Sequence, residues 1–169
     1  MFIIFSGLPG SGKSTIAQAL VKRLGAFYLR IDTIEQAIRE ADEHPREMGP
    51  EGYFVACSMA RENLKMGATV VADSVNPLTL TRDAYRDVAR STGRDFLEIE
   101  VVCSDRDEHR RRVETRTSEV KGLILPEWHN VTGLHYEPWN RERLVLDSGK
   151  LSVEQCVTLA VAAVAALAR

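Results

Sequence analysis

Residues 7–14, with the sequence GLPGSGKS, constrain this chain more than any other segment, and they follow the apolar run FIIF at residues 2–5. The spacing, a glycine, four residues and then Gly-Lys-Ser, is typical of a loop that binds polyphosphates. Glycines permit backbone angles that a β-carbon hinders, and they let N–H groups close around an anion. The sequence therefore predicts a strand, a phosphate-binding loop and a helix at residues 13–24.

Individual residues of this loop have distinct expected roles. Lys13 can place its ammonium between the outer phosphates, and the hydroxyl of Ser14 can bind Mg²⁺. The helix that follows would point the positive end of its dipole at the anion. A glycine-rich turn that binds nothing is the alternative, and the flanking strand and helix patterns count against it. The residues expected to bind the nucleotide are Gly7, Pro9, Gly10, Ser11, Gly12, Lys13, Ser14 and Thr15.

Length and charge limit the class of protein. With 169 residues, the chain can form one domain, expected over residues 1–169, that buries about 70% of its unfolded surface. A net charge of −2 disfavours a general binder of nucleic acid or of membrane surfaces. The first residues lack the pattern of a signal peptide, and polar side chains interrupt the apolar run at residues 151–168. We expect a cytoplasmic protein whose last helix packs on the core, and the oligomeric state is left open.

The cysteines predict no metal site. Cys57, Cys103 and Cys156 are odd in number and lack the spacing of metal ligands. We expect them to be buried thiols in a reducing compartment.

Two aspartates are predicted at the carboxyl ends of parallel strands. Asp32 follows the apolar run at residues 26–31, and Asp73 follows the run at residues 69–72. Ligands of open α/β sheets bind at this edge, so both are candidates for chemistry. Asp73 would position Mg²⁺ directly or through water. As alternatives, Asp32 or Thr33 could cap the next helix, and Asp73 could be a turn residue.

Apolar patterns complete an alternation of strands and helices. The polar segment at residues 43–50 predicts a loop between helices, and Glu98 and Glu100 predict partial exposure of their strand. The remaining predicted elements are helices at residues 52–66, 79–92 and 151–168 and strands at residues 96–103 and 143–147.

Arginines and acidic residues are interspersed over residues 105–116. Arg112 and Arg116 lie four apart, so on a helix they would face the same way and could stabilise charge on a phosphoryl group in transit. The charge pattern alone favours a solvated helix with internal ion pairs. Aromatic, proline and glycine residues then predict an ordered loop, at residues 122–139, that can close over the site.

Four features occur together in this chain: the loop at residues 7–14, the strand end at Asp32, the sequence VVADSVN at residues 70–76 and the Arg112/Arg116 pair. Together they resemble the small P-loop kinases, in particular a bacterial group related to chloramphenicol phosphotransferase, gluconate kinase, adenylylsulfate kinase and polynucleotide kinase. The resemblance implies an α/β P-loop NTPase fold with a five-stranded parallel sheet in the order 2-3-1-4-5, helices on both faces and a lid at about residues 105–130. It also implies ATP and Mg²⁺ as cofactors, and it favours the functional interpretation of the two arginines.

The resemblance also suggests a role for Asp32. In the chloramphenicol phosphotransferases, an aspartate at the matching position is thought to activate the acceptor hydroxyl. The sequence of this chain does not decide whether Asp32 or Asp73 is the base. Two family patterns are not reproduced. Adenylylsulfate kinases carry Asp-Gly-Asp where this chain has RIDT at residues 30–33, and residues 40–52 lack the loop of gluconate kinases.

The sequence therefore predicts an ATP-dependent kinase that transfers the γ-phosphate to a hydroxyl of a small molecule. Asp32 would accept the proton, while Lys13, Arg112 and Arg116 would stabilise charge. The alternatives are a regulatory protein that binds or hydrolyses ATP and a polynucleotide 5′-hydroxyl kinase, and the net charge disfavours the second. The acceptor pocket is expected to be built from residues 34–62 and 76–82.

Overall fold

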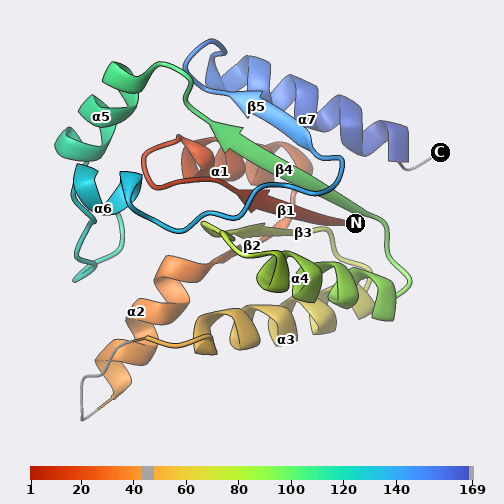
Figure 1. Ribbon diagram of the computed structural model, residues 1–169. Helices are drawn as coiled ribbons and strands as arrows, with labels where there is room; N and C mark the ends of the chain where they lie inside the picture. Colours follow the sequence, from red (N-terminus) through yellow and green to blue (C-terminus); the bar gives the residue numbers. More distant parts are fainter. Residues whose placement is uncertain (43–47, 168–169) are drawn as a thin grey trace.

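The computed structural model describes residues 1–42 and 48–167 (Figure 1). Most of the loop predicted at residues 43–50, including His44, thus lies outside the described residues. Five parallel strands form one sheet in the order β2-β3-β1-β4-β5, which confirms the predicted fold class and strand order. The strands are β1 (Phe2–Ser6), β2 (Phe27–Arg30), β3 (Val70–Asp73), β4 (Phe96–Val102) and β5 (Leu144–Asp147).

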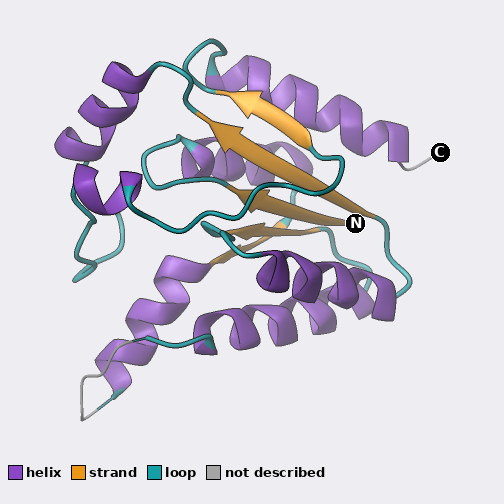
Figure 2. Cartoon of the chain, in the orientation of Figure 1, coloured by secondary structure: helices purple, strands orange, loops and turns teal. Residues whose placement is uncertain are grey.

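Helices cover both faces of this sheet, because alternate residues of the central strand point to opposite sides. Phe2 and Ile4 of β1 pack in a core with α3 (Glu51–Lys65) and α4 (Thr79–Ser91). Ile3 and Phe5 pack in a second core with α1 (Lys13–Leu24) and α7 (Val153–Leu167). The remaining helices lie beyond the carboxyl ends of the strands (Figure 2). They are α2 (Ile31–Ala41), α5 (Arg106–Thr115) and α6 (Trp128–Thr132).

The junction between β2 and α2 differs from the prediction. The helix begins at Ile31, directly after the strand, and the backbone of Arg30 forms its N-cap without a side-chain hydrogen bond. Ile31 is buried in the core with α3 and α4, so the chain has to turn immediately after Arg30. Asp32 therefore lies in the first helical turn, where a carboxylate complements the helix dipole. The alternative in which Asp32 or Thr33 caps this helix is therefore excluded.

The prediction that Glu98 and Glu100 are partly exposed was also wrong, since they are 5% and 8% exposed. Glu98 Oε1 lies 2.8 Å from Nη2 of Arg141, and Glu100 Oε2 lies 2.7 Å from Nη2 of Arg143. These arginines follow the glutamates by 43 residues and supply the opposite charge that a buried carboxylate needs. Polar residues on a strand are thus no sign of exposure when such a partner covers them.

The last helix and the cysteines test two further expectations. Helix α7 contacts α1, β4 and β5, as predicted for a helix on the core. Within the described part of the chain, no helix combines the length and the apolar character needed to cross a membrane. Only Cys156 is a buried thiol, because Cys57 and Cys103 are half-buried.

Candidate active site

The loop at residues 7–14 connects β1 to α1 and lies over the carboxyl ends of the central strands (Figure 1). Gly7 has φ 140° and Gly10 has φ 82°, which is backbone that L-amino acids with a side chain rarely adopt. A β-carbon on Gly7 would overlap the carbonyl oxygen of Val101, and one on Gly10 would overlap Cγ2 of Val113. The first two glycines of the motif are thus required both by backbone angle and by close packing against β4 and α5.

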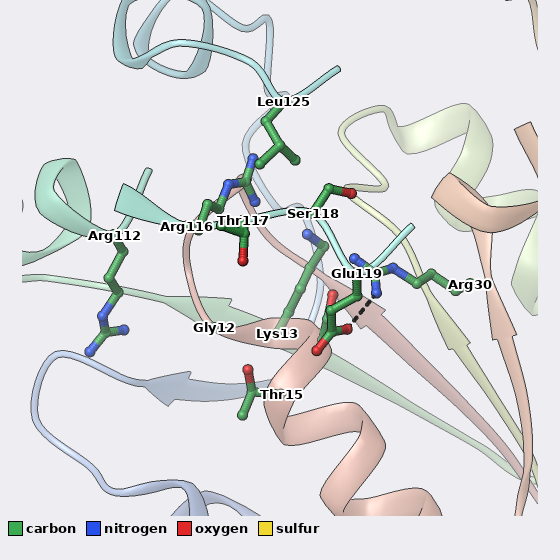
Figure 3. A pocket seen from close by; sticks show the side chains of 12 residues that line it. Gly12, Lys13, Thr15, Arg30, Arg112, Arg116, Thr117, Ser118, Glu119 and Leu125 are labelled. Atoms are coloured by element: carbon green, nitrogen blue, oxygen red, sulfur yellow. Dashed lines mark hydrogen bonds and ion pairs between the residues drawn. The ribbon is translucent and has the colours of Figure 1, made fainter. Parts of the chain in front are cut away.

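A cavity of about 250 Å³ opens over this loop, and we call it the phosphate pocket (Figure 3). Lys13 is only 7% exposed and is directed into it, as the motif predicts. The pocket brings together loop residues with residues from β2, α5 and the segment after α5. Its lining consists of Gly10, Gly12, Lys13, Ser14, Thr15, Arg30, Arg112, Arg116, Thr117, Ser118, Glu119 and Leu125.

Three of the residues expected to bind nucleotide do not line the phosphate pocket. Gly7 packs against β4, and Ser11 is buried beneath the loop, where its carbonyl accepts a hydrogen bond from the hydroxyl of Ser148 at 2.6 Å. The carbonyl of Pro9 accepts a hydrogen bond from Nε2 of His109 at 2.9 Å. These residues hold the shape of the loop.

His109 was missed by sequence reasoning. It lies on α5 within a run of charged residues, yet it is buried between Pro9 and the ring of Trp128, which it meets edge to face at 5.2 Å. Together with Val113 it fixes α5 against the phosphate-binding loop. A lone histidine in a charged segment gives no sequence signal for such a contact.

Arg112 and Arg116 both line the phosphate pocket, but they do not face the same way. Arg112 donates from Nε to Glu108 at 2.7 Å and from Nη1 to the hydroxyl of Ser148 at 2.8 Å. Helix α5 ends at Thr115, so Arg116 has extended backbone and its guanidinium points toward Leu125 in Figure 3. The expectation of one shared helical face was wrong because the helix ends one residue too early.

Arg116 is the less restrained of the two arginines. Burial lowers the pKa of its guanidinium, with Asp32 acting in the opposite direction. Its Nε has no hydrogen-bond partner among the described residues. A buried cationic N–H group in this position is suited to bind an anion.

Asp73 lies beneath the loop and is 2% exposed. Its Oδ2 accepts a hydrogen bond from the hydroxyl of Tyr28 at 2.7 Å, and burial together with Asp73 raises the pKa of that phenol. Its Oδ1 has no partner among the described residues. Across all the residues that the structure describes, no group of three or more His, Cys, Asp or Glu side chains could hold a metal ion by itself. An ion here would thus need phosphate oxygens or water in addition to Asp73 and Ser14.

A second cavity of about 370 Å³ lies between α2, α3 and the residues that follow β3, and we call it the acid pocket. Asp32 lines this pocket and not the phosphate pocket. The described lining residues are Ile31, Asp32, Glu35, Gly49, Pro50, Tyr53, Val75, Pro77, Leu78, Thr81 and Leu134. Most of them belong to the two segments in which the sequence places the acceptor pocket.

Arg30 joins the two pockets, and sequence reasoning gave it no role. It lines the phosphate pocket, and its Nε lies 3.5 Å from Oδ2 of Asp32 in the acid pocket. Its Nη1 also donates to Glu119 at 3.0 Å, the contact drawn in Figure 3. Asp32 is therefore connected to the phosphate pocket through one guanidinium.

The wall of the acid pocket after β3 is held by Arg82, which is 1% exposed. Its guanidinium donates to the carbonyls of Asn76 at 3.0 Å and Glu137 at 2.9 Å. It also lies 4.2 Å from the ring centre of Trp139. Asn76 has φ 49°, an angle that asparagine tolerates better than most residues, and its Nδ2 donates to Ser6 at 3.0 Å. This wall is thus rigid.

Comparison with known proteins relates the chain to kinases. Residues 2–123 match the sequence family described as "AAA domain". A relative from Aeropyrum pernix, named "Probable adenylyl-sulfate kinase", is 30% identical over 164 residues, which cover 90% of this chain and 86% of the relative.

Solved structures share the fold over nearly the full length. The crystal structure of APE1195 superposes with a TM-score of 0.78 and 29% identity, and the match covers 100% of this chain and 97% of that one. A gluconokinase from Sinorhizobium meliloti gives a TM-score of 0.67 at 20% identity, with 98% and 91% covered, which supports the fold alone.

Proposed function

This chain belongs to the AAA domain family and is an ATP-dependent kinase of a small molecule, and we propose that the acceptor is a hydroxyl group bound in the acid pocket. The observation that carries the proposal is the position of Arg30, which lines the phosphate pocket and pairs with Asp32 of the acid pocket. A phosphate donor and a proton acceptor would thus meet at one guanidinium. The named kinase relative supports the reaction class.

On the phosphate side, the glycine loop, Lys13 and Arg116 would hold the β- and γ-phosphates of ATP. When bound, ATP would supply the phosphoryl group, and Mg²⁺ would neutralise part of the charge of the phosphates. Ser14 and the unpartnered Oδ1 of Asp73 fit a role as ligands of Mg²⁺, since both lie at this edge of the sheet. Lys13 and Arg116 would then stabilise the charge that develops as the phosphoryl group leaves.

On the acceptor side, Asp32 would take the proton of the attacking hydroxyl. Arg30 would orient this carboxylate and would itself lie next to the transferred group. Asp73 is the less suitable base, because its Oδ2 is already bonded to Tyr28 and it does not line the acid pocket. We therefore assign proton acceptance to Asp32 and metal positioning to Asp73.

The nucleoside of ATP would lie in a third cavity of about 320 Å³. This cavity shares Gly12, Thr15 and Arg112 with the phosphate pocket, and no residue of the acid pocket lines it. Ile16 and Leu151 offer apolar contacts, and Arg112 is fixed there by Ser148. Donor base, phosphates and acceptor would thus occupy three adjoining sites.

The predicted lid at about residues 105–130 has a natural function in this scheme. Glu119 of this segment accepts hydrogen bonds from Arg30 at 3.0 Å and from Gln18 at 2.9 Å. We infer that the segment excludes water from the phosphate pocket when ATP is bound.

Two other functions have less support. A regulator that only binds or hydrolyses ATP would not need a second pocket with a carboxylate next to the phosphates. A polynucleotide kinase would need a basic groove, whereas the acid pocket brings two carboxylates to this position.

The test is transfer of labelled γ-phosphate from ATP, with Mg²⁺, to a panel of hydroxyl compounds. The panel would include aminoglycosides, chloramphenicol, gluconate, adenylylsulfate, nucleosides and 5′-hydroxyl oligonucleotides. A labelled small molecule supports the proposal and names the acceptor class. Release of labelled inorganic phosphate, with every compound of the panel unlabelled, favours the ATPase interpretation. Label on the oligonucleotides alone favours the polynucleotide kinase.

A further inference from the structure

The acid pocket has a charge that the phosphoryl-transfer scheme does not require. Asp32 has a role in that scheme, but Glu35 lies one turn further along α2 and lines the same cavity. No lysine, arginine or histidine is among the described residues that line it. The described wall therefore has two carboxylates and no cation.

Glu35 is held at this position by packing. Its side chain is 20% exposed and packs so closely against Gly52 that a β-carbon there would lie 2.6 Å from Glu35 Cγ. Its one ion-pair contact in the described chain is Arg39, on the outer part of the same helix, at 3.6 Å. Burial raises the pKa of Glu35 despite the opposing charge of Arg39, and the nearby Asp32 and Glu51 add to the increase. A positive ligand in the pocket would relieve this cost.

The rest of the described wall is mostly apolar. Val75, Pro77 and Leu78 form one side, Leu134 contributes from the segment after α6, and Tyr53 adds an aromatic ring. The tyrosine hydroxyl accepts the backbone N–H of Asn76 at 3.1 Å, which fixes its ring in the wall. Such a wall fits a compact apolar body and would not satisfy a highly hydroxylated sugar.

We propose that the acceptor is an amphipathic alcohol with a protonated amino group, bound with its apolar body against this wall and its ammonium beside Glu35. The inference rests on the proposed function, because it specifies the substrate class of that same pocket. This acceptor class differs from the compound in the name of the adenylyl-sulfate kinase relative. The sulfate and phosphate groups of adenylyl sulfate are both negative, so Glu35 and Asp32 would repel them in this pocket. Glu35 would act in specificity, and Asp32 would keep its role in proton transfer.

The test uses three probes that share a phenyl ring and a secondary hydroxyl but differ in charge. They are 2-amino-1-phenylethanol (cation), 1-phenylethane-1,2-diol (neutral) and mandelate (anion). Dissociation constants for the full chain, measured by ligand-observed NMR titration at millimolar concentrations, should increase in that order. The cation should bind about 10-fold or more tightly than the anion.

A matched pair of variants locates the effect. Glu35→Gln should weaken binding of the cation about 3- to 10-fold and leave the neutral diol unchanged. Glu40→Gln changes an exposed carboxylate of the same helix outside the pocket and should alter neither constant. Equal binding of all three probes, tighter binding of mandelate, binding of none, or equal effects of the two variants would each overturn the inference.

Adenylylsulfate is run as a fourth ligand in the same titration and as an acceptor in the transfer assay. Efficient phosphorylation of adenylylsulfate, together with equal binding of the charged and neutral probes, would overturn the inference. The proposal of a hydroxyl acceptor in the acid pocket would then stand. The predicted charge order without phosphate transfer to any hydroxyl compound would support the pocket chemistry and remove the proposal that this pocket binds a hydroxyl acceptor. The two failures are therefore distinguishable.

Discussion

The phosphate pocket and the acid pocket lie at the same edge of the sheet, but their chemistry is opposite. The phosphate pocket combines backbone N–H groups with Lys13, Arg112 and Arg116, whereas the described wall of the acid pocket combines carboxylates with apolar side chains. A polyphosphate is attracted to the first and repelled from the second. Under the proposed function, donor and acceptor occupy separate pockets, and Arg30 forms ion pairs with Asp32 of the acid pocket and with Glu119 of the phosphate pocket.

The two pockets are also braced differently. The loop beneath the phosphate pocket is held from one side by α5, through His109 and Val113. The wall of the acid pocket after β3 is held by Arg82, which the segment at residues 136–139 encloses. Each pocket should therefore respond to its own substitutions, and the following predictions test that independence.

The largest effect is expected from Lys13→Ala. Loss of the ammonium that would lie between the outer phosphates should reduce kcat for phosphate transfer about 10³-fold or more. Binding of 2-amino-1-phenylethanol should stay within about 2-fold, because Lys13 does not line the acid pocket. Lys65→Ala, at an exposed ion pair on α3, is the control. A normal rate for Lys13→Ala would remove the loop from the mechanism.

Asp32→Asn should affect the acceptor side alone. The amide keeps the shape of the side chain but cannot take the proton, so kcat should fall about 10²- to 10⁴-fold. The dissociation constant of ATP, measured by calorimetry with Mg²⁺, should be nearly unchanged. Asp87→Asn, at an exposed position of α4, provides the control. Full activity of Asp32→Asn would exclude it as the base, and greatly weakened ATP binding would show that the pockets are not independent.

Gly10→Ala tests the brace between the loop and α5. The new β-carbon would overlap Val113 at a φ of 82°, so the free energy of unfolding should fall by about 2–4 kcal/mol. Gly93→Ala has a φ of 62° with no atom within 4 Å and should cost about 1–2 kcal/mol from backbone strain alone. Urea denaturation of both variants isolates the overlap, and equal losses would contradict close packing at Gly10.

The two pockets also differ in how far the sequence predicts them. The path of the phosphate-binding loop follows from backbone angles that its own glycines permit, so its motif predicts that path and the direction of Lys13. The distant contacts that hold the loop, from His109 and Ser148, were not predicted. The role of Arg82 in the acid pocket depends in part on Glu137 and Pro138, which lie 55 and 56 residues away, and no spacing rule connects such pairs. Asp32 is an intermediate case. Its place at the sheet edge was predicted, but its position inside a helix was not, because burial of Ile31 determines where that helix begins.

The smallest predicted effect concerns the stability cost of a carboxylate in the acid pocket. Because burial raises the pKa of Glu35, the folded state keeps its proton to a higher pH than the unfolded state does. The protein should therefore lose stability relative to Glu35→Gln as the pH rises from the ordinary glutamate pKa to the raised one, and lose no more above it. At pH 7 we expect Glu35→Gln to melt about 1–2 °C higher.

Calorimetric melting of the protein and of both variants between pH 4 and 8 measures this difference, with Glu40→Gln expected to match the parent. A lower melting temperature for Glu35→Gln would mean that the ion pair with Arg39 outweighs the burial of the carboxylate. A higher melting temperature for Glu35→Gln, together with weaker binding of the cation, would mean that Glu35 lowers the stability of the protein while it contributes to binding of the ligand. Glu35 would then contribute to the acid pocket what Lys13 contributes to the phosphate pocket, a charge whose counterion is the ligand.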